Sequence, residues 1–286
     1  MVRPNVRFFT FSQYHNKKPV AGSTNIRVNQ LIKYWPGADL YQYGEFPETL
    51  IFQKVYIAED YKWPAHFEGV KILDVCDPDW LEGVAIVESA HAMDAITCPT
   101  EPLAEFMRQF HRNVHVVPDR FDIDVLPDPK VHKGEAKTVV WFGYSHNAEC
   151  LKPAVNKILE LGLNLIVISN DDPMIQRWTT LEKDDFYTYI KYDEETIYED
   201  LKKADFALLP EGSRPVDIFK SNNKTIKANL AGLPVARTAE DMDLYMAESA
   251  RIEWQKKNYN KIEEDYDVRK SVEEMQQIIK DIMEKK

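Results

Sequence analysis

The sequence lacks the features expected of a membrane, secreted or metal-binding protein. It contains no apolar run of about 18 residues, so we expect no membrane span. Residues 1–12 show no signal-peptide pattern. The cysteines Cys76, Cys98 and Cys150 are far apart, odd in number and without metal-ligand spacing, which predicts a reducing, cytoplasmic setting and no metal site.

An excess of basic charge is also missing. The net charge is −11, whereas proteins that mainly grip nucleic acid are usually basic. This lowers the expectation of a nucleic-acid-binding protein, although a local basic cleft remains compatible with the composition. Most of the late acidic residues are explained as solvated faces.

The chain has room for two domains and an ordinary globular composition, with 286 residues, 44% hydrophobic and 29% charged. In the first half, strands are expected at 6–11, 39–43, 49–55, 71–75, 94–98 and 114–117, and helices at 25–35, 81–93 and 102–110. Strands that alternate with helices predict parallel pairing in a doubly wound α/β sheet.

The second half restarts the same pattern after a stretch rich in Pro and Asp. Strands are expected at 138–142, 164–169, 186–190 and 206–209, and helices at 148–161, 195–203, 240–246 and 271–284. We therefore predict a first Rossmann-like domain at 1–125, a linker at 126–136, a second Rossmann-like domain at 137–245 and C-terminal helices at 246–286. The C-terminal helices are expected to pack back toward the first domain.

The most informative segment follows the apolar stretch at 206–209 and ends in A-G-L-P-V. It is predicted to run from a loop into a helix, with Ser221 or Asn222 at the helix start and Gly232 just past its end. Lys220 and Lys224 then lie near a helix N-terminus, where free N–H groups and the helix dipole favour an anion such as a diphosphate. The alternative is an ordinary α/β unit with solvated lysines.

This segment, K-S-x-N-K followed by a helix and A-G-x-P-V, resembles the donor-binding helix of GT-B glycosyltransferases. It is most similar to their large retaining family, which carries "K..nK..ea.a.GlPV". The resemblance implies two Rossmann-like domains that face each other across a cleft, with C-terminal helices. It implies a hexosyl- or pentosyltransferase that moves sugar from a nucleotide sugar to an acceptor hydroxyl, retaining and without metal or cofactor. The acceptor would be a glycan, a small molecule or a modified DNA base.

The resemblance also assigns roles to residues. Lys220 and Lys224 would stabilise the leaving diphosphate, Asp217 or Glu211 would hold the donor sugar, and Asp77, after a buried strand, would orient the acceptor. The residues expected to bind the donor are Gly22, Ser23, Arg27, Arg120, Gly143, Tyr144, Ser145, His146, Glu211, Ser221 and Asn223. In retaining relatives a second glutamate holds ribose hydroxyls. Lys227 stands at that position here, which leaves the nucleotide open.

Several of these residues have a structural alternative. The Gly22 loop can be a surface turn capped by Thr24, and His146 can be incidental. Arg120, expected to pair with phosphate, can instead form a hinge salt bridge with Asp119, Asp122 or Asp124, and Asp77 can be a helix cap.

Two other functions remain open at this stage. The first is a viral-type glycosyltransferase of DNA bases, for which exposed Trp63 and Trp80 would supply stacking surfaces. The second is a non-catalytic binding or scaffold protein. It is favoured by Lys227 and by Tyr144, which stands after Gly143 where many relatives carry Arg and Lys.

Overall fold

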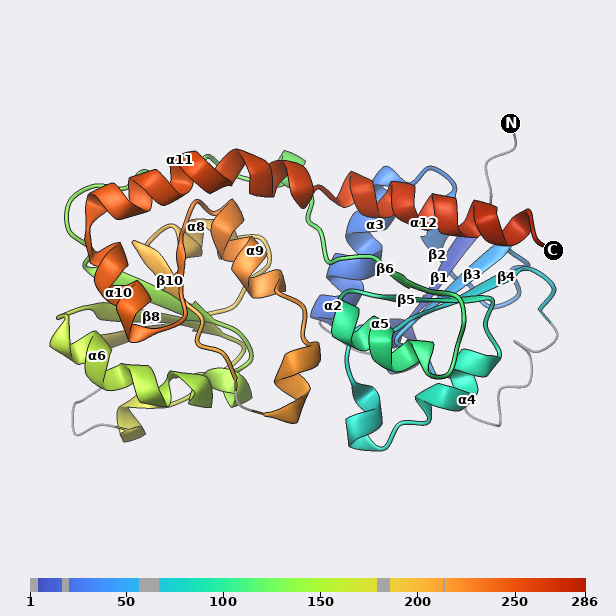
Figure 1. Ribbon diagram of the computed structural model, residues 1–286, viewed down its shortest axis with the longest axis horizontal. Coiled ribbons are helices and arrows are strands. Elements are labelled where there is room, and N and C mark those ends of the chain that lie inside the picture. Colours follow the sequence, from blue (N-terminus) through green and yellow to red (C-terminus); the bar gives the residue numbers. More distant parts are fainter. Residues whose placement is uncertain (1–4, 17–20, 57–66, 179–185, 213) are drawn as a thin grey trace. The chain divides into compact units, whose positions relative to one another are not determined.

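The computed structural model describes residues 5–16, 21–56, 67–178, 186–212 and 214–286 (Figure 1). The chain forms two compact units. The first unit comprises residues 1–122, 214–221 and 266–286, and the second comprises 123–213 and 222–265. Trp63 lies outside the described residues.

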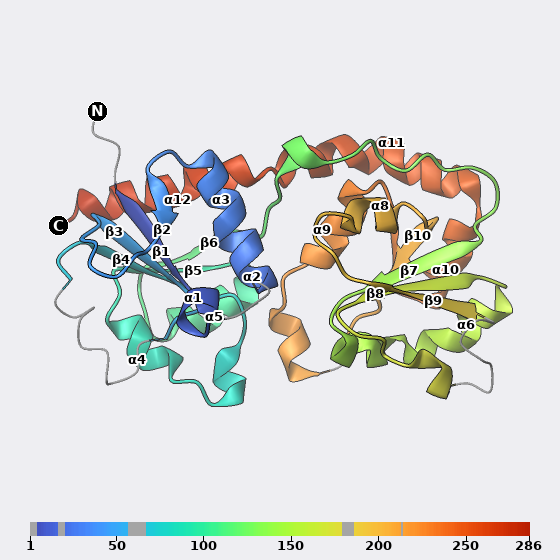
Figure 2. The same ribbon diagram turned by 180° about the vertical axis from the view of Figure 1, so that it is seen from behind.

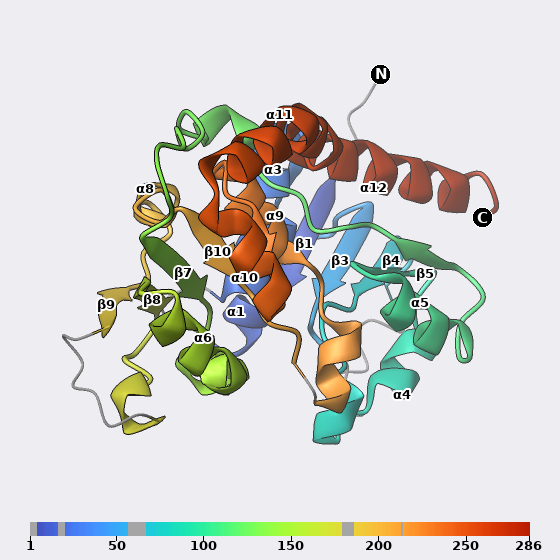
Figure 3. The same ribbon diagram turned by 60° about the vertical axis from the view of Figure 1, so that its left-hand side comes forward.

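The sheet of the first unit is parallel, with strand order β2-β1-β3-β4-β5-β6. Figure 3 shows β1, β3, β4 and β5 side by side. The strands are β1 (Val6–Thr10), β2 (Ala38–Leu40), β3 (Thr49–Gln53), β4 (Val70–Asp74), β5 (Ala95–Cys98) and β6 (Val114–Val116). Apolar and β-branched side chains bury the four central strands, β1, β3, β4 and β5, as expected where helices cover both sides of a sheet.

Helices cover both faces of the first sheet. Helices α3 and α12 share a core with one face, and α4 and α5 pack on the other. The helices are α1 (Phe11–Tyr14), α2 (Gly22–Thr24), α3 (Gln30–Tyr34), α4 (Ile86–His91), α5 (Glu101–Arg108) and α12 (Val268–Met283), with 3-10 turns at Asp79–Glu82 and Pro215–Phe219. Helix α12 packs through Val268, Val272, Met275 and Ile279, which recur at helical spacing.

The helix after β1 is less regular than the sequence indicates. It starts at Gly22 and contains a π-helical turn, Asn25–Asn29, between α2 and α3. Thr24, expected as its cap, lies inside it instead, and its hydroxyl donates to Gln53 Oε1 at 3.0 Å. The interpretation of Thr24 as a cap is therefore wrong.

The second unit has a parallel sheet of strand order β11-β10-β7-β8-β9, and Figure 2 shows β7, β8 and β9 side by side. The strands are β7 (Thr138–Phe142), β8 (Asn164–Ser169), β9 (Tyr187–Lys191), β10 (Phe206–Leu208) and β11 (Val235–Ala236). The helices are α6 (Val155–Glu160), α8 (Ile197–Leu201), α9 (Asn223–Leu230), α10 (Ala239–Met246) and α11 (Glu248–Asp265), with 3-10 turns at Ile123–Val125, Ser145–Ala154 and Ile175–Trp178. One apolar core joins the sheet to α6, α8, α9 and α10.

Helix α9 ends as the sequence predicts. Gly232 has φ +85°, and the following N–H of Leu233 donates to the carbonyl of Ala228 at 3.0 Å. A Cβ at Gly232 would lie 2.7 Å from the backbone nitrogen of Lys130. Glycine is therefore required here both for the left-handed conformation and for the close approach.

The division of the chain differs in detail from the expected one. Residues 126–136, expected as a linker, group with the second unit, as do residues 123–125, expected in the first domain. Residues 214–221 group with the first unit. Of the C-terminal helices, α11 belongs to the second unit and α12 to the first. Among the described residues, no helix is long and apolar enough to cross a bilayer.

Each sheet has one place where the chain reverses its direction of strand addition. It lies between β1 and β3 in the first unit and between β7 and β10 in the second. In open parallel sheets, ligands bind outside the carboxyl ends of the strands at such points. Ligand-binding groups are therefore expected at the carboxyl ends of the strands at these two points.

Candidate functional site

Gly143 follows β7 at the reversal point of the second sheet. Its φ is +153°, and a Cβ there would lie 3.3 Å from the Trp141 ring and 3.6 Å from Lys224 Nζ. The missing side chain leaves backbone at the strand end close to the lysine, an arrangement that suits the approach of a ligand.

Lys224 lies in the first turn of α9. Its Nζ is 5.8 Å from the centroid of the Trp141 ring. Asn223 is the first helical residue, and the side chain of Asn222 at the N-cap makes no capping hydrogen bond. The first-turn N–H groups and a lysine therefore meet the Gly143 loop, which is an anion-binding arrangement.

The loops after three neighbouring strands of the second sheet lie side by side. Gly143 N–H donates to Ile168 O at 3.1 Å, and Tyr192 N–H donates to Ser169 O at 2.8 Å. Ser145 N–H donates to the Asn170 side chain at 2.9 Å. The Gly143 loop is thereby fixed to the end of β8, which also holds the loop after β9, and the predicted site residue Ser145 contributes through its backbone.

Two predicted residues of this loop form an aromatic surface. Tyr144 is exposed, and its ring lies parallel to that of His146, with centroids 5.7 Å apart. A stacked pair at a strand end offers a planar ring to a flat ligand such as a nucleobase.

A second cationic residue of α9, Lys227, is buried. Its ammonium donates to Glu194 Oε1 at 2.9 Å and to the Tyr192 hydroxyl at 3.1 Å. It also lies 5.6 Å and 5.9 Å from the ring centroids of Tyr192 and Tyr198. Burial, followed by the charge of Glu194, raises the pKa of Tyr192 well above its ordinary value, so this phenol stays protonated and donates to Glu194.

Arg237 was missed by the sequence analysis. It follows β11 directly, donates to the Thr225 hydroxyl in the first turn of α9 at 2.9 Å, and lies 3.7 Å from Glu211. A basic residue just after a parallel strand is the signal that would have found it. Glu211, predicted near the donor sugar, is exposed beside this arginine.

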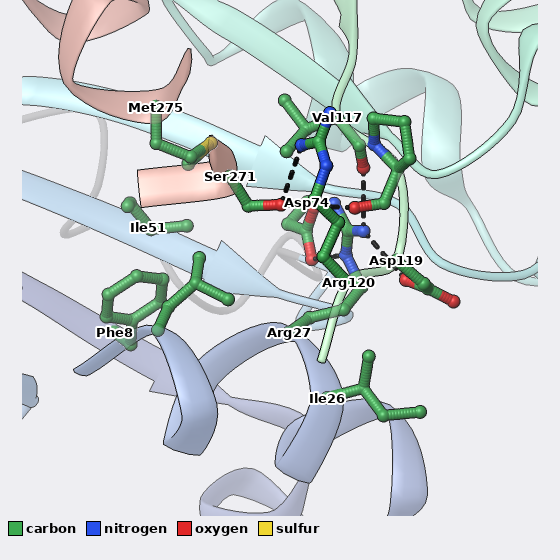
Figure 4. A pocket seen from close by; sticks show the side chains of 12 residues that line it. Phe8, Ile26, Arg27, Ile51, Asp74, Val117, Asp119, Arg120, Ser271 and Met275 are labelled. Atoms are coloured by element: carbon green, nitrogen blue, oxygen red, sulfur yellow. Dashed lines mark hydrogen bonds and ion pairs between the residues drawn. The ribbon is translucent and has the colours of Figure 1, made fainter. Parts of the chain in front are cut away.

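In the first unit, Arg27 does not reach the surface. Its guanidinium donates to both carboxylate oxygens of Asp74, at 2.6 Å and 2.7 Å, and to Asp119 at 2.9 Å (Figure 4). It also donates to Val117 O at 2.9 Å. Because these contacts use its donors in a buried site, Arg27 serves the structure of the first unit rather than the donor.

Arg120 and Arg27 line one small cavity in the first unit (Figure 4). Arg120 also has partners inside this unit. It donates to both carboxylate oxygens of Glu274 on α12, at 2.7 Å and 2.8 Å, and to Ser271 at 2.9 Å. This is a bidentate ion pair of the kind that fixes geometry. The expected choice between phosphate and a neighbouring aspartate is therefore answered by a third partner, Glu274.

A charged cluster lies beyond the ends of β3 and β4 in the first unit. Lys54 follows β3 with φ +54° and pairs with Asp77 at 2.7 Å and Asp79 at 3.1 Å. Tyr56 donates to Asp79 at 2.6 Å. Burial alone would lower the pKa of Lys54, but the two carboxylates outweigh it and raise that pKa above its ordinary value. Lys54 therefore stays charged.

The two carboxylates of this cluster differ in access. The side chain of Asp77 is 39% exposed, whereas that of Asp79 is 8% exposed. Pro78 occupies the N-cap of the 3-10 turn that follows, so Asp77 is not its cap. Sequence reasoning found Asp77 but missed Lys54, whose backbone conformation is unusual for a residue with a side chain.

The segment 214–221, which the sequence joined to the donor helix, is held by the first unit. Asp217 pairs with Arg214 at 2.9 Å and with Lys220 at 3.5 Å. Hydrogen bonds from Arg214 lower the pKa of Asp217 to about 2. The Ser221 hydroxyl donates to Asp119 at 2.5 Å. Of the two residues predicted at the start of α9, Ser221 and Asn222, the N-cap is therefore Asn222 and not Ser221.

Three further predicted residues lie in the first unit. Gly22 and Ser23 form the first turn of the helix after β1, with open space at the Gly22 Cβ position. Trp80 stacks on Phe106 at 3.7 Å between centroids and meets Phe219 edge-on at 5.1 Å. Trp80 thus helps to hold the 214–221 segment.

The predicted residues therefore form separate groups. Gly143, Tyr144, Ser145, His146, Asn223 and Lys224 meet at the edge of the second unit. Asp217, Lys220 and Ser221 lie together in the first unit, and Asp77 lies with Lys54. The described residues contain no group of three or more His, Cys, Asp and Glu side chains arranged to hold a metal ion.

No protein-family model and no curated protein matches the chain. Solved structures do match it. A glycosyltransferase from Rickettsia africae is 6% identical, with TM-score 0.64 over 97% of this chain and 98% of that one. T4 phage BGT, solved with UDP and Mn²⁺, is 11% identical, with TM-score 0.59 over 96% of this chain and 99% of that one.

A third neighbour is TarM of S. aureus, solved with UDP, which is 13% identical with TM-score 0.58. The match covers 81% of this chain but only 55% of that one, so the chain spans about half the length of TarM. This chain has the GT-B fold. The prediction of two Rossmann-like α/β domains is confirmed.

Proposed function

We propose that this protein is a glycosyltransferase that moves a sugar from a nucleotide sugar to an acceptor hydroxyl. The observation that carries the proposal is the convergence of Gly143, Lys224 and the start of α9. They meet at the carboxyl ends of the strands of the second sheet, at its reversal point. The GT-B fold shared with enzymes solved with UDP or UDP-glucose supports it.

In this proposal the second unit holds the donor diphosphate. Lys224, the first-turn N–H groups of α9 and Arg237 stabilise the charge that develops on the leaving phosphate as the bond to the sugar breaks. A preorganised contact of this kind is worth about 10²–10³ in rate. Tyr144, stacked on His146, presents a ring to the base.

Asp77 is proposed to orient the acceptor hydroxyl, with Lys54 as the residue that positions it. Asp77 is accessible and ionically fixed beyond the end of a parallel strand, where substrate-binding groups are expected. Asp217 and Lys220 are further proposed donor contacts. Their support is the sequence resemblance, together with the low pKa that keeps Asp217 ionised.

Metal independence and retention at the anomeric carbon are also proposals. T4 phage BGT is described with Mn²⁺, TarM with α-GlcNAc-glycerol and a further neighbour as a β-glucosyltransferase. The sequence resemblance favours retention. NMR of fresh product from an α-linked donor distinguishes the outcomes, because an α-linkage supports retention and a β-linkage contradicts it.

The test of the proposed function is a thermal-shift screen of nucleotide sugars and nucleoside diphosphates, with and without EDTA. Bound donor raises the melting temperature by mass action. We expect a shift with at least one nucleotide that survives EDTA. A flat response across the panel would contradict the proposed function, and a shift abolished by EDTA would contradict metal independence.

A second candidate function is sugar transfer to a modified DNA base. Its support is the match to T4 phage BGT over nearly the full length of both chains. A neighbour with this kind of match is described as a DNA-modifying enzyme. Transfer of label to DNA containing hydroxymethylated bases, with unmodified DNA as the control, tests this candidate. A non-catalytic scaffold would instead bind donor without hydrolysing or transferring it.

A further inference from the structure

The cluster of Lys227, Tyr192 and Glu194 lies close to the proposed phosphate site. Lys227 is three residues after Lys224 on α9, and residues with this spacing are neighbours on a helix surface, about 5–6 Å apart. Tyr192 follows β9 and is hydrogen-bonded to the end of β8, which also holds the Gly143 loop. The cluster and the Gly143 loop are therefore attached to the same strand end, and their lysines lie one helical turn apart on α9.

The cluster has one buried and one accessible charge. The side chain of Lys227 is 7% exposed, whereas that of Glu194 is 43% exposed. A buried ion pair contributes little net stability compared with apolar packing, because desolvation offsets the attraction. Fixing the direction of the accessible carboxylate is a purpose that such a pair serves well.

Both oxygens of Glu194 are held on their inner side. Lys227 donates to Oε1 and Tyr192 donates to Oε2. A carboxylate has about four lone-pair directions, so each oxygen keeps capacity for another donor. Two adjacent acceptors match two adjacent hydroxyl groups, such as the 2′ and 3′ hydroxyls of ribose.

We infer that Glu194 binds the ribose diol of the donor nucleotide and that Lys227 and Tyr192 are its positioning residues. This inference rests on the proposed function. It assigns the ligand as a nucleoside diphosphate with ribose, not deoxyribose. It also explains why a lysine stands on α9 where retaining relatives have a glutamate, since here the acid comes from the loop after β9.

The experiment compares two ligands that differ only in the diol. Dissociation constants of UDP and 2′,3′-dideoxy-UDP are measured by calorimetry on the full chain. The wild-type protein is expected to bind UDP at least about tenfold more tightly than 2′,3′-dideoxy-UDP. This is the difference expected for the loss of one charge-assisted hydrogen bond. Glu194→Gln is expected to weaken UDP binding to nearly the dideoxy level and to leave dideoxy-UDP binding unchanged.

Two further variants separate positioning from folding. Lys227→Met keeps the length of the side chain but removes the ammonium, and it should reduce the preference for UDP while dideoxy-UDP binding persists. Persistent dideoxy-UDP binding itself shows that the site is folded. Glu195→Gln, a charge-matched change at an exposed neighbour, should leave both constants unchanged.

The outcomes are distinguishable. Equal affinity of wild type for the two nucleotides, or an unchanged preference in Glu194→Gln, overturns the role of Glu194 while donor binding stands. Binding of neither nucleotide contradicts a uridine donor, and the same pair is then measured with the nucleoside diphosphate that the thermal-shift panel selects. Binding of no nucleoside diphosphate refutes the proposed function, and the assignment of Glu194 with it.

Discussion

The two sheets differ in how charged side chains are arranged at their carboxyl edges, that is, at the carboxyl ends of their strands. In the first unit, the charged side chains satisfy one another: Arg27 is enclosed by Asp74 and Asp119, and Lys54 is flanked by Asp77 and Asp79. In the second unit, the edge combines a bare glycine, the exposed Tyr144, a first-turn lysine and the half-exposed Glu194. The same parallel architecture thus supports a first edge with paired charges and a second edge with exposed groups at the proposed donor site.

This difference indicates a division of labour. Burying a charge pair carries a desolvation penalty, and removing one partner leaves the other charge buried and uncompensated. The first unit is therefore expected to depend on its charge pairs for folding. Groups arranged around an anion depend on the ligand instead, so their removal should affect binding more than stability.

The largest effect is expected at Arg27. Arg27→Met leaves Asp74 and Asp119 buried without their cation, which should lower the free energy of unfolding by about 3–5 kcal/mol. Urea unfolding measures the change. Arg108→Met removes a more exposed ion pair with Glu101 and should cost less than about 1 kcal/mol. Equal losses in the two variants would remove the basis for calling the first edge internally paired.

The next effect is expected at Lys224, on binding rather than stability. Lys224→Ala removes a charge-assisted contact and should weaken UDP binding by about ten- to a hundredfold, or 1.4–2.8 kcal/mol. Stability without ligand should stay the same or rise slightly, because a lysine in the first turn opposes the helix dipole. Calorimetry and urea unfolding measure the two quantities.

Lys152→Ala is the matched control for Lys224, since Lys152 also lies over an indole ring, 5.4 Å from the centroid of Trp178. It should leave UDP affinity unchanged. If Lys224→Ala reduced stability and kept UDP affinity, Lys224 would be a structural residue and the second edge would resemble the first.

Asp77 is the one accessible carboxylate of its cluster. It therefore tests whether the first edge also contributes a substrate-binding group. Asp77→Asn should lower the transfer rate about tenfold, as for loss of one hydrogen bond to a charged group, with UDP affinity unchanged. Asp79→Asn keeps the same lysine neighbour but alters a buried site, so it should reduce stability more than transfer. Transfer that survives Asp77→Asn within about twofold would make Asp77 another structural partner of Lys54.

Much of the fold followed from the sequence because apolar periodicity reports burial directly. The expected strand at 138–142 coincides with β7, and Gly232 ends α9 as predicted. Helix starts were harder, because Ser221 and Thr24 had capping chemistry but found partners in Asp119 and Gln53, which are far away in sequence. Local preference lost to tertiary contacts in both cases.

The site divides in the same way. Lys224 and Gly143 were predictable because a strand, a glycine and a helix start are local signals. The pairing of Arg27 with Asp74 spans 47 residues, and that of Arg120 with Glu274 spans 154 residues, so no local pattern announces either. Glu194 was missed because it stands in an acidic stretch, where only the buried Lys227 distinguishes it from its neighbours.

The smallest effect is expected at Asp217, whose pKa of about 2 makes its contribution pH-dependent. The folded pKa lies below the unfolded value of about 3.9, so its stabilisation is present above pH 4 and is lost as the pH falls toward 2. Because Arg214 is about half exposed, solvent screening limits the pair to less than about 1 kcal/mol.

Asp217→Asn keeps an oxygen that can accept the Arg214 N–H and removes only the charge. The difference in unfolding free energy between wild type and this variant should therefore be small at pH 7 and vanish near pH 2. A difference that is constant across this range would show that the charge of Asp217 contributes nothing, and that the edge of the first unit is less completely paired than its geometry indicates.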